Sequence, residues 1–238
     1  MNRKRFFRPV NQYQQEVGET LEHFAVGQMP DVKFLEGRYC SVEHIDARKH
    51  LNDIIDFYWK NAVPSDWTYM FDQPFETAEA VQERLQDYEK SENPYFFAIR
   101  DKETDKVLGT FSLMRIDPKN RVLEMGRVIY APALQKTSAA TEAQYLVMNY
   151  VFENLGYRRY EWKCDHLNQS SGNAAKRLGF TYEGTFRKHV VYKGRTRDTD
   201  WFSVIDQDWP KLKKRFENWL SPNNFDKTGQ QIKALKDC

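Results

Sequence analysis

The sequence predicts an α/β fold, of the α+β kind, in which helices cover both faces of a mixed central sheet of about seven strands. Residues 124–180 have the pattern strand, short polar loop, long helix, strand, short helix. Residues 95–130 contain three strand-like segments separated by short polar turns, which predicts an antiparallel meander. The chain has 238 residues, 40% of them hydrophobic, enough for one large domain with extensions.

The first third of the chain supplies a surface segment, one strand and two helices. Residues 1–30 are polar without a clear period and are predicted to form an N-terminal extension. A strand is expected within 32–43, and the helical spacing of apolar residues predicts a helix over 50–60. An aromatic loop follows over 61–74. A second helix is expected over 77–90, with Thr77 as its N-cap.

The remaining elements follow in order along the chain. The meander strands are predicted at 95–100, 107–116 and 122–130. A long helix from about 138 to 154 should end before Gly156. The right-handed crossover rule makes the next strand, 159–165, parallel to the strand 122–130. The last expected elements are a short helix at 169–178, a hairpin of 182–192 with 199–205, a helix at 211–220 and a polar C-terminal tail at 221–238.

The loop from Gln135 to Ala143 predicts an anion-binding site. It connects a strand that ends before Pro132 to the start of a helix, and most of its residues are small. Free backbone N–H groups and the positive end of the helix dipole converge at such a position. A nucleotide or the pyrophosphate of CoA would suit this loop.

Composition excludes several classes of function. The 36 basic and 34 acidic residues nearly balance, so there is no case for nucleic acid as a partner, even though Lys193–Arg197 and the N-terminus are locally basic. No apolar run is long enough to span a bilayer, so no membrane partner is expected. Three scattered cysteines and five histidines without ligand spacing predict no metal site and a reduced, cytoplasmic protein. The basic N-terminus is not followed by an apolar region, so it is not a secretory signal, although an organelle presequence remains open.

At this point the chain resembles the GNAT acetyltransferase superfamily, and most closely the branch that contains ribosomal-protein N-terminal acetyltransferases. The resemblance covers roughly Val32 to Pro210, within a domain of 31–220. It depends on the loop Gln135 to Ala143, on Asn168-Gln169-Ser170-Ser171, and on Leu178-Gly179-Phe180 followed by Glu183, Gly184 and Arg187. The family fold has a split between its two central parallel strands, which admits the pantetheine arm of acetyl-CoA.

The resemblance implies the cofactor-binding residues. Backbone groups of Val128 and Tyr130 would bond the pantetheine, and Asn168 would bond it from the other side of the split, which we expect after Tyr130 and before Asp165. The pyrophosphate would lie on the helix start, with a hydroxyl from Thr141. The residues expected to hold it are Gln135, Lys136, Thr137, Ser138, Ala139 and Ala140. Lys136 and Ser138 stand where the family usually has glycine, which is suited to close approach and positive φ.

The resemblance also implies catalytic roles. Glu124 is the expected general base, acting through a water, and a backbone N–H near Val128 is the expected oxyanion donor. The family's usual tyrosine acid is replaced by Ala175, which leaves Ser171 as the nearest substitute. The opposing interpretations are an ordinary strand carboxylate for Glu124 and a helix-cap residue for Ser171. A nucleophilic Cys164 activated by His166 is a further alternative, against which stands the commoner buried thiol.

Substrate contacts are expected from the aromatic loop and the closing hairpin, namely Trp67, Tyr69, Arg187 and His189, with His189 as an alternative base. The sequence thus predicts an N-acetyltransferase that uses acetyl-CoA without a metal. Its acceptor is a primary amine, either a small amine or amino acid or a protein N-terminus. A narrowing of the cleft by the extension and the aromatic loop favours a small acceptor or short peptide. The alternative is a non-catalytic acyl-CoA-binding or scaffold protein, and the chain is expected to be a monomer or homodimer.

Overall fold

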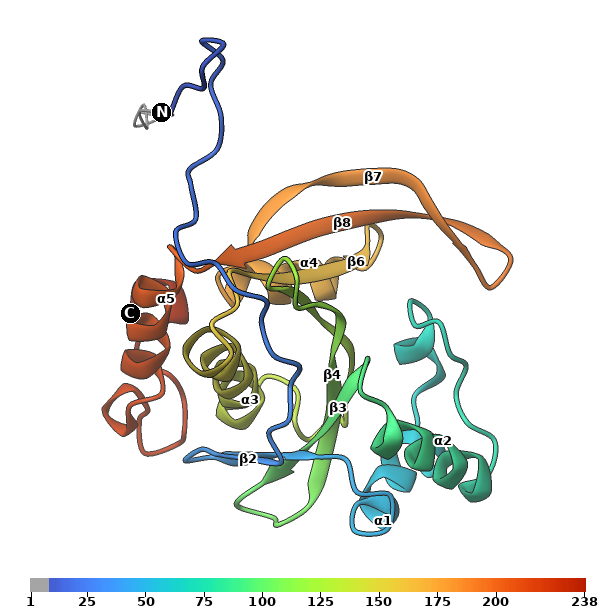
Figure 1. Cartoon of the computed structure of the whole chain (residues 1–238). Helices are drawn as coiled ribbons and strands as arrows, with labels where there is room; N and C mark the ends of the chain where they lie inside the picture. Colours follow the sequence, from blue (N-terminus) through green and yellow to red (C-terminus); the bar gives the residue numbers. More distant parts are fainter. Residues whose placement is uncertain (1–8) are drawn as a thin grey trace.

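A computed structural model describes residues 9–238 and contains one eight-stranded sheet in the order β1-β2-β3-β4-β5-β6-β8-β7 (Figure 1). Among these strands, β5 and β6 are the only parallel neighbours. The predicted class is confirmed, with eight strands in place of about seven. The strands are β1 Phe34–Glu36, β2 Cys40–His44, β3 Tyr95–Asp101, β4 Val107–Asp117, β5 Val122–Tyr130, β6 Arg159–Asp165, β7 Thr181–Tyr192 and β8 Arg195–Ile205.

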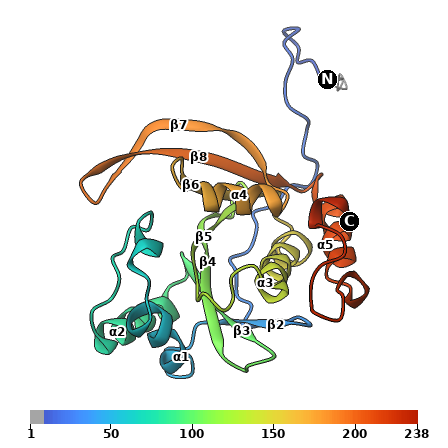
Figure 2. The same ribbon diagram turned by 180° about the vertical axis from the view of Figure 1, so that it is seen from behind.

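Helices cover both faces of this sheet, as Figures 1 and 2 show from opposite sides. Helices α1 and α2 lie on one face, and α3 and α5 lie on the other, with α4 beside β6 and β7. Their bounds are α1 Leu51–Ile55, α2 Ala78–Lys90, α3 Ser138–Asn149, α4 Gln169–Arg177 and α5 Trp209–Trp219. Helices α1 and α3 each continue as a π-helical turn, Asp56–Lys60 and Tyr150–Asn154, so the predicted lengths of about 50–60 and 138–154 are reproduced.

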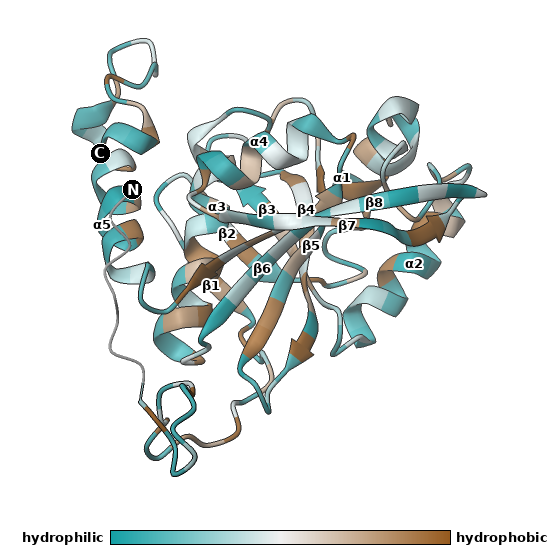
Figure 3. Cartoon of the chain, turned by 90° about the horizontal axis from the view of Figure 1, so that it is seen from above, coloured by the Kyte–Doolittle hydropathy of each residue, from teal (hydrophilic) through white to brown (hydrophobic). Residues whose placement is uncertain are grey.

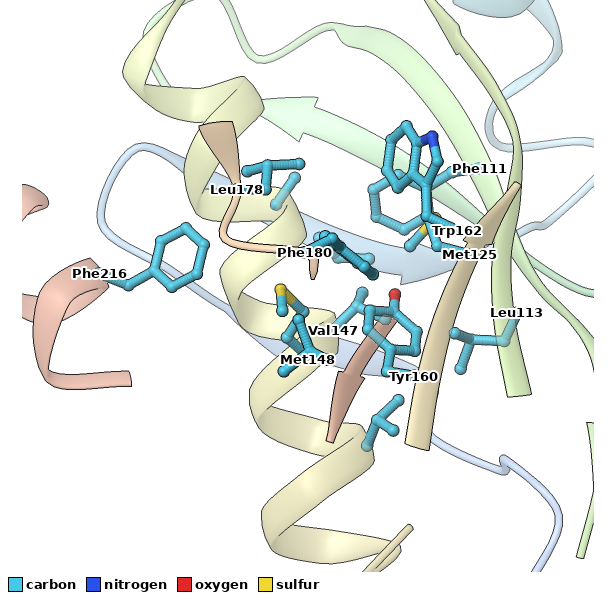
Figure 4. Packing of buried hydrophobic residues seen from close by; sticks show 14 of the residues in the cluster. Phe111, Leu113, Met125, Val147, Met148, Tyr160, Trp162, Leu178, Phe180 and Phe216 are labelled. Carbon is cyan, nitrogen blue, oxygen red and sulfur yellow. The ribbon is translucent and has the colours of Figure 1, made fainter. Parts of the chain in front are cut away.

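Strand alternation divides the apolar residues between two cores. In β3, Phe97 and Ile99 point into the larger core under α3, and Phe96 and Ala98 point into the smaller core under α1 and α2. Figure 4 shows the larger core, where side chains of β4, β5, β6 and α3 interdigitate. Helices α2 and α5 have mixed hydrophilic and hydrophobic ribbons in Figure 3, as expected for helices with one buried face.

Two predicted boundaries are corrected. The single strand expected within 32–43 is a hairpin of β1 and β2, in which Glu142 of α3 accepts the backbone N–H groups of Arg38, Tyr39 and Cys40. Strand β8 begins at Arg195, four residues before the predicted start, because Arg195, Thr196 and Arg197 pair with the end of β7. The expected cap at Thr77 is confirmed, since its side chain accepts the N–H of Ala80 at 3.1 Å.

The two parallel strands part sooner than the resemblance implied. The β5–β6 ladder ends at Met125 and Trp162, whereas β5 continues beside β4 as far as Tyr130. A bulge occurs at this point, because the β4–β5 register shifts between Thr110 and Ser112 and Arg127 takes a φ of 51°. The inserted residue reverses the alternation, so Met125 and Val128 both face the larger core side. This bulge directs the last residues of β5 away from β6.

The two terminal segments lie at one side of the sheet. The described part of the extension, 9–30, contacts the turns near Pro118 and Tyr157, through the N–H of Gly27 and the carbonyl of Gln28. Residues 221–238, predicted as a polar tail, fold back on α5, and Leu235 is buried in the larger core. Phe225 and Trp219 form an edge-to-face aromatic contact within this segment.

Candidate active site

One large cavity of about 1530 Å³ opens at the parting of β5 and β6. Its wall contains residues from both sheet faces, such as Glu124 and Lys163 on the α1–α2 side and Trp162 and Ser171 on the α3–α4 side. Ligand pockets for a single small molecule usually enclose about 300–1000 Å³. The cavity therefore has room for two substrates, one from each side of the sheet. We call the part near the start of α3 the donor half and the part near residues 65–71 the acceptor half.

The donor half is built on the loop before α3. Thr137 caps this helix, because its hydroxyl accepts the N–H of Ala140 at 3.1 Å. The backbone N–H groups of Lys136, Ser138 and Ala139 find no acceptor among the described residues. These N–H groups and the helix dipole form a cradle for an anion such as a phosphate.

Lys136 adopts the left-handed conformation that glycine provides in the related loops, with a φ of 63°. The lysine occupies this position with its side chain exposed on the cavity wall. The loop therefore keeps the backbone shape that the family's glycine would give and adds a positive charge. Ser138 also lines the cavity, so neither residue closes the site.

Two further polar groups border the donor half. Arg177 of α4 donates to the hydroxyl of Thr141 at 3.1 Å and lies 5.2 Å from the ring centre of Trp219. Asn168 caps α4 by accepting the N–H of Ser171 at 3.2 Å, and its Nδ2 group has no partner among the described residues. Asn168 therefore serves as a cap and still has an amide donor available in the cavity wall.

Glu124 lies at the junction of the two halves. Glu124 as a whole residue is only 4% exposed. Arg115 contacts its Oε2 at 2.8 Å and Lys163 contacts the same oxygen at 3.0 Å. Oε1 receives no hydrogen bond from the described residues, and Glu124 lines the cavity. Glu124 is therefore not an exposed strand carboxylate, and its role as a base stays a prediction.

The side of the cavity that faces α4 contains Ser171, whose Oγ accepts the indole N–H of Trp162 at 3.0 Å. Ala175, which occupies the place of the family's tyrosine, is fully buried in the larger core. Burial raises the pKa of the Cys164 thiol to about 11, which disfavours a thiolate. The ring of His166 binds Asp200 at 2.9 Å. The alternative of an activated Cys164 therefore lacks its activating partner.

The acceptor half is roofed by the loop 61–77. Lys193 at the tip of the β7–β8 hairpin donates to the carbonyl of Trp67 at 2.7 Å, and the rings of Phe71 and Tyr192 lie 5.6 Å apart. Asp72 secures the loop from below by pairing with Arg127 of the β5 bulge at 2.8 Å. The tip of the β7–β8 hairpin is therefore held against this loop through Lys193 and Tyr192.

Most of the expected site residues lie in the cavity wall. The structure brings together Glu124, Ser171, Val128, Tyr130, Gln135, Lys136, Thr137, Ser138, Ala140, Thr141, Asn168, Tyr69 and His189. Ala139 is buried beneath the helix start. Trp67 does not line the cavity, because its ring packs against Tyr58 in the smaller core. Arg187 is exposed on β7, also outside the cavity wall.

Several wall residues were not anticipated from the sequence. Arg115 and Lys163 come from different strands, and Arg177 comes from α4, whereas Arg197 belongs to the closing hairpin from which substrate contacts were expected. The C-terminal segment adds Phe225 and the stretch 229–231. Strand alternation predicts weakly that Lys163 shares a sheet face with Glu124 of the neighbouring strand. No sequence pattern predicts the contribution of residues 221–238, because their contacts depend on the fold of the whole chain.

A sheet that parts between two parallel strands, with an anion cradle on one side and a buried carboxylate at the junction, is typical of a group-transfer enzyme. The family model described as "Acetyltransferase (GNAT) domain" matches residues 47–181. The crystal structure of a GCN5-related N-acetyltransferase from Brucella melitensis is 45% identical, with a TM-score of 0.88, over 91% of this chain and 98% of that one.

Two other relatives agree. A probable GNAT-family acetyltransferase from Chromobacterium violaceum is 31% identical, with a TM-score of 0.76, over 82% of this chain and 98% of that one. "Uncharacterized N-acetyltransferase p20" of Bacillus licheniformis is 29% identical over 66% of this chain and 88% of its own length. The chain belongs to the GNAT acetyltransferase family. It is therefore an acetyltransferase, and the family implies transfer of an acetyl group from acetyl-CoA.

No helix within residues 9–238 combines the length and apolar character needed to cross a membrane. Within the same range, no group of three or more histidine, cysteine or acidic side chains is placed to hold a metal ion.

Proposed function

We propose that this acetyltransferase transfers the acetyl group to a primary amine by direct attack of the amine on the thioester. The observation that supports this most strongly is the continuous cavity through the parted strands, which joins the cradle at Ser138 to the open Oε1 of Glu124. Direct transfer requires both substrates in one space at the same time. A cavity with two halves meets that requirement.

In the donor half, we assign the CoA pyrophosphate to the loop Gln135 to Thr141. The free N–H groups of Lys136, Ser138 and Ala139 would donate to its oxygens, and the Lys136 charge would add to the helix dipole. Asn168 Nδ2 would donate to the pantetheine. The open loop argues against the alternative of a non-catalytic scaffold that has lost its cofactor.

At the junction, Glu124 would take the proton of the attacking amine at Oε1, through a water. The amine nitrogen bonds to the thioester carbon, and the charge that develops on the carbonyl oxygen would be met by the backbone N–H near Val128. The carbon–sulfur bond then breaks, and the leaving thiolate takes a proton from Ser171 or from solvent. The Ser171 hydroxyl accepts the indole N–H of Trp162 and also hydrogen-bonds the Cys164 thiol, so it would have to turn from Cys164 to the leaving sulfur.

The acceptor is a small amine, an amino acid or a short peptide, in preference to the N-terminus of a folded protein. The roof of loop 61–77, closed by the Lys193–Trp67 and Phe71–Tyr192 contacts, supports this choice. The extension does not contribute to it, since none of its described residues lines the cavity. This corrects the expectation that the extension narrows the cleft.

The test is calorimetric titration of acetyl-CoA into the purified chain, followed by release of free CoA thiol with a panel of amines. We expect micromolar binding and amine-dependent thiol release. Binding without release for any amine would favour a non-catalytic role, and absence of binding would refute the assignment of the donor half.

A further inference from the structure

The cavity wall contains six cationic side chains among the described residues, and they differ in how their charge is balanced. Arg115 and Lys163 pair with Glu124, and Arg127 pairs with Asp72. The other three, Lys136, Arg177 and Arg197, form no ion pair with a carboxylate of residues 9–238. Lys136 and Arg177 border the donor half, where phosphates would balance them. Phosphates bound in the donor half would not balance the charge of Arg197.

Arg197 is buried but its charge is unpaired. The residue is 8% exposed, and its Nε donates to the hydroxyl of Thr199 at 3.1 Å. The guanidinium lies 5.5 Å from the ring centre of Phe71 and 5.7 Å from that of Tyr192, and since these ring centres are 5.6 Å apart, it lies beside the aromatic pair and contacts both rings. Its two terminal nitrogens have no acceptor among the described residues, and they are not among the fully buried unpaired atoms, so they are accessible from the cavity. These nitrogens present a rigid fork of donors to the cavity.

One carboxylate on the same sheet face already has hydrogen-bond partners. Asp165 lines the same wall, but its Oδ1 accepts the N–H of Leu167 at 2.9 Å and its Oδ2 accepts the hydroxyl of Tyr192 at 2.8 Å. A guanidinium at the wall of a mostly buried site is incompletely hydrated, and an anion bound from the cavity would balance its charge. The arrangement therefore indicates that part of a ligand completes it.

That ligand is the acceptor and not the acetyl donor. Cross-strand pairs join Lys163 to Trp201 and Asp165 to Thr199, so Thr199 and Arg197 follow Trp201 along the sheet face that bears Lys163 and Glu124. The contacts of Arg197 with Phe71 and Tyr192 place it under the roof of the acceptor half. The cradle for phosphate lies on the other side of the parted strands.

We propose that Arg197 binds a carboxylate of the acceptor through its two terminal nitrogens, so that the enzyme acetylates an amine that also bears a carboxylate, as in an amino acid or a short peptide. This inference depends on the proposed function and narrows it to one acceptor class. A planar fork of donors matches the two oxygens of a carboxylate. Phe71 and Tyr192 hold the fork in place before the acceptor arrives.

The experiment measures kcat/KM for matched acceptor pairs: amino acids against their decarboxylated amines, and dipeptides with free against amidated C-termini. The wild-type chain is expected to favour the free carboxylate by at least about 100-fold, as expected when a buried polar group would otherwise be left unpaired. Arg197→Gln is expected to bring this ratio below about fivefold, and Arg197→Lys to give an intermediate ratio. The matched control is Arg195→Gln, two residues earlier on β8, exposed and outside the cavity wall, which should keep the wild-type ratio.

Preference of the wild-type chain for decarboxylated or amidated acceptors would overturn the inference. An equal loss of rate with both members of each pair in Arg197→Gln would also overturn it, because that result indicates a structural role. If acetyl-CoA binds but no acceptor is acetylated, the proposed function fails. In that case, calorimetric titration of the same acceptor pairs into the CoA-saturated chain tests Arg197 separately. Loss of binding of the carboxylate-bearing acceptors in Arg197→Gln supports the carboxylate site. Binding of these acceptors that the variant does not affect refutes the site.

Discussion

The ammonium of Lys163 lies 3.0 Å from Oε2 of Glu124, and both side chains are 5% exposed. Arg115 contacts the same oxygen from the other side at 2.8 Å. The two cations fix the carboxylate in place and leave Oε1 directed to the cavity. Glu161 pairs with Lys163 at 2.7 Å as well, but it does not line the cavity.

Replacing Glu124 with Gln should lower kcat by about 100- to 10,000-fold, the range typical for loss of a general base. Acetyl-CoA affinity should change little, because the carboxylate lies outside the donor half. Steady-state kinetics and calorimetry would measure the two quantities. Glu161→Gln is the matched control, since it also removes a carboxylate from Lys163. A similar loss of kcat in both variants would indicate that Glu124 acts only by positioning Lys163.

Ser138→Glu should reduce acetyl-CoA affinity at least tenfold, because a carboxylate at the start of α3 repels the pyrophosphate. The same substitution should leave the melting temperature equal or slightly higher, since an acidic side chain in the first turn stabilises a helix by about 0.3–1 kcal/mol. Calorimetric titration and thermal denaturation separate these effects. Unchanged affinity would show that the pyrophosphate lies elsewhere.

Lys136→Gly and Lys136→Ala test the positive φ of 63° at this position. Both substitutions remove the charge, so both should weaken acetyl-CoA binding to a similar degree. The glycine variant should be more stable than the alanine variant by about 1 kcal/mol, because only alanine carries a Cβ into the left-handed region. Chemical denaturation measures the difference. Equal stabilities would mean that the loop does not keep this conformation in solution.

Glu43 predicts a loss of stability in acid. Burial alone would raise the pKa of this carboxyl, but hydrogen bonds from Lys49, His50 and Arg100 outweigh it and lower the pKa to about 2. A carboxyl whose pKa is depressed by folding adds stability above its unfolded pKa of about 4.3, and this contribution falls as the pH approaches 2. Lowering the Glu43 pKa from about 4.3 to about 2 corresponds to roughly 3 kcal/mol of the free energy of unfolding at neutral pH.

The measurement compares the free energy of unfolding of wild type and Glu43→Gln between pH 6 and pH 3. The wild-type value should fall more steeply with acid than that of the variant, so the two curves converge at low pH. Asp56→Asn is a useful control, since this exposed carboxyl lies outside the Glu43 contacts and its substitution should leave the pH dependence unchanged. Parallel curves for wild type and Glu43→Gln would contradict the assignment.

Local patterns were sufficient for much of the fold. The Thr77 cap, the meander from Tyr95 to Tyr130 and the helix after Ser138 depend on periodicity and capping within a few residues of each element. The place of Glu124 in the cavity wall also follows from strand alternation, given the family's strand order. In contrast, the hairpin at 34–44 was expected as one strand, because its turn is stabilised by Glu142, about a hundred residues away.

The sequence by itself determined the class of the enzyme, the loop before α3 and the strand that bears Glu124, because each depends on the order and spacing of residues close together in the chain. Only the tertiary structure decided the acceptor half. From the sequence, Arg197 is expected in a solvated basic hairpin tip. In the structure, β7–β8 pairing and the ring of Phe71 bury it under loop 61–77. Trp67 reads as a substrate contact and packs in the core instead. The burial and charge pairing of a side chain depend on segments that are far apart in the sequence, so no local pattern predicts them.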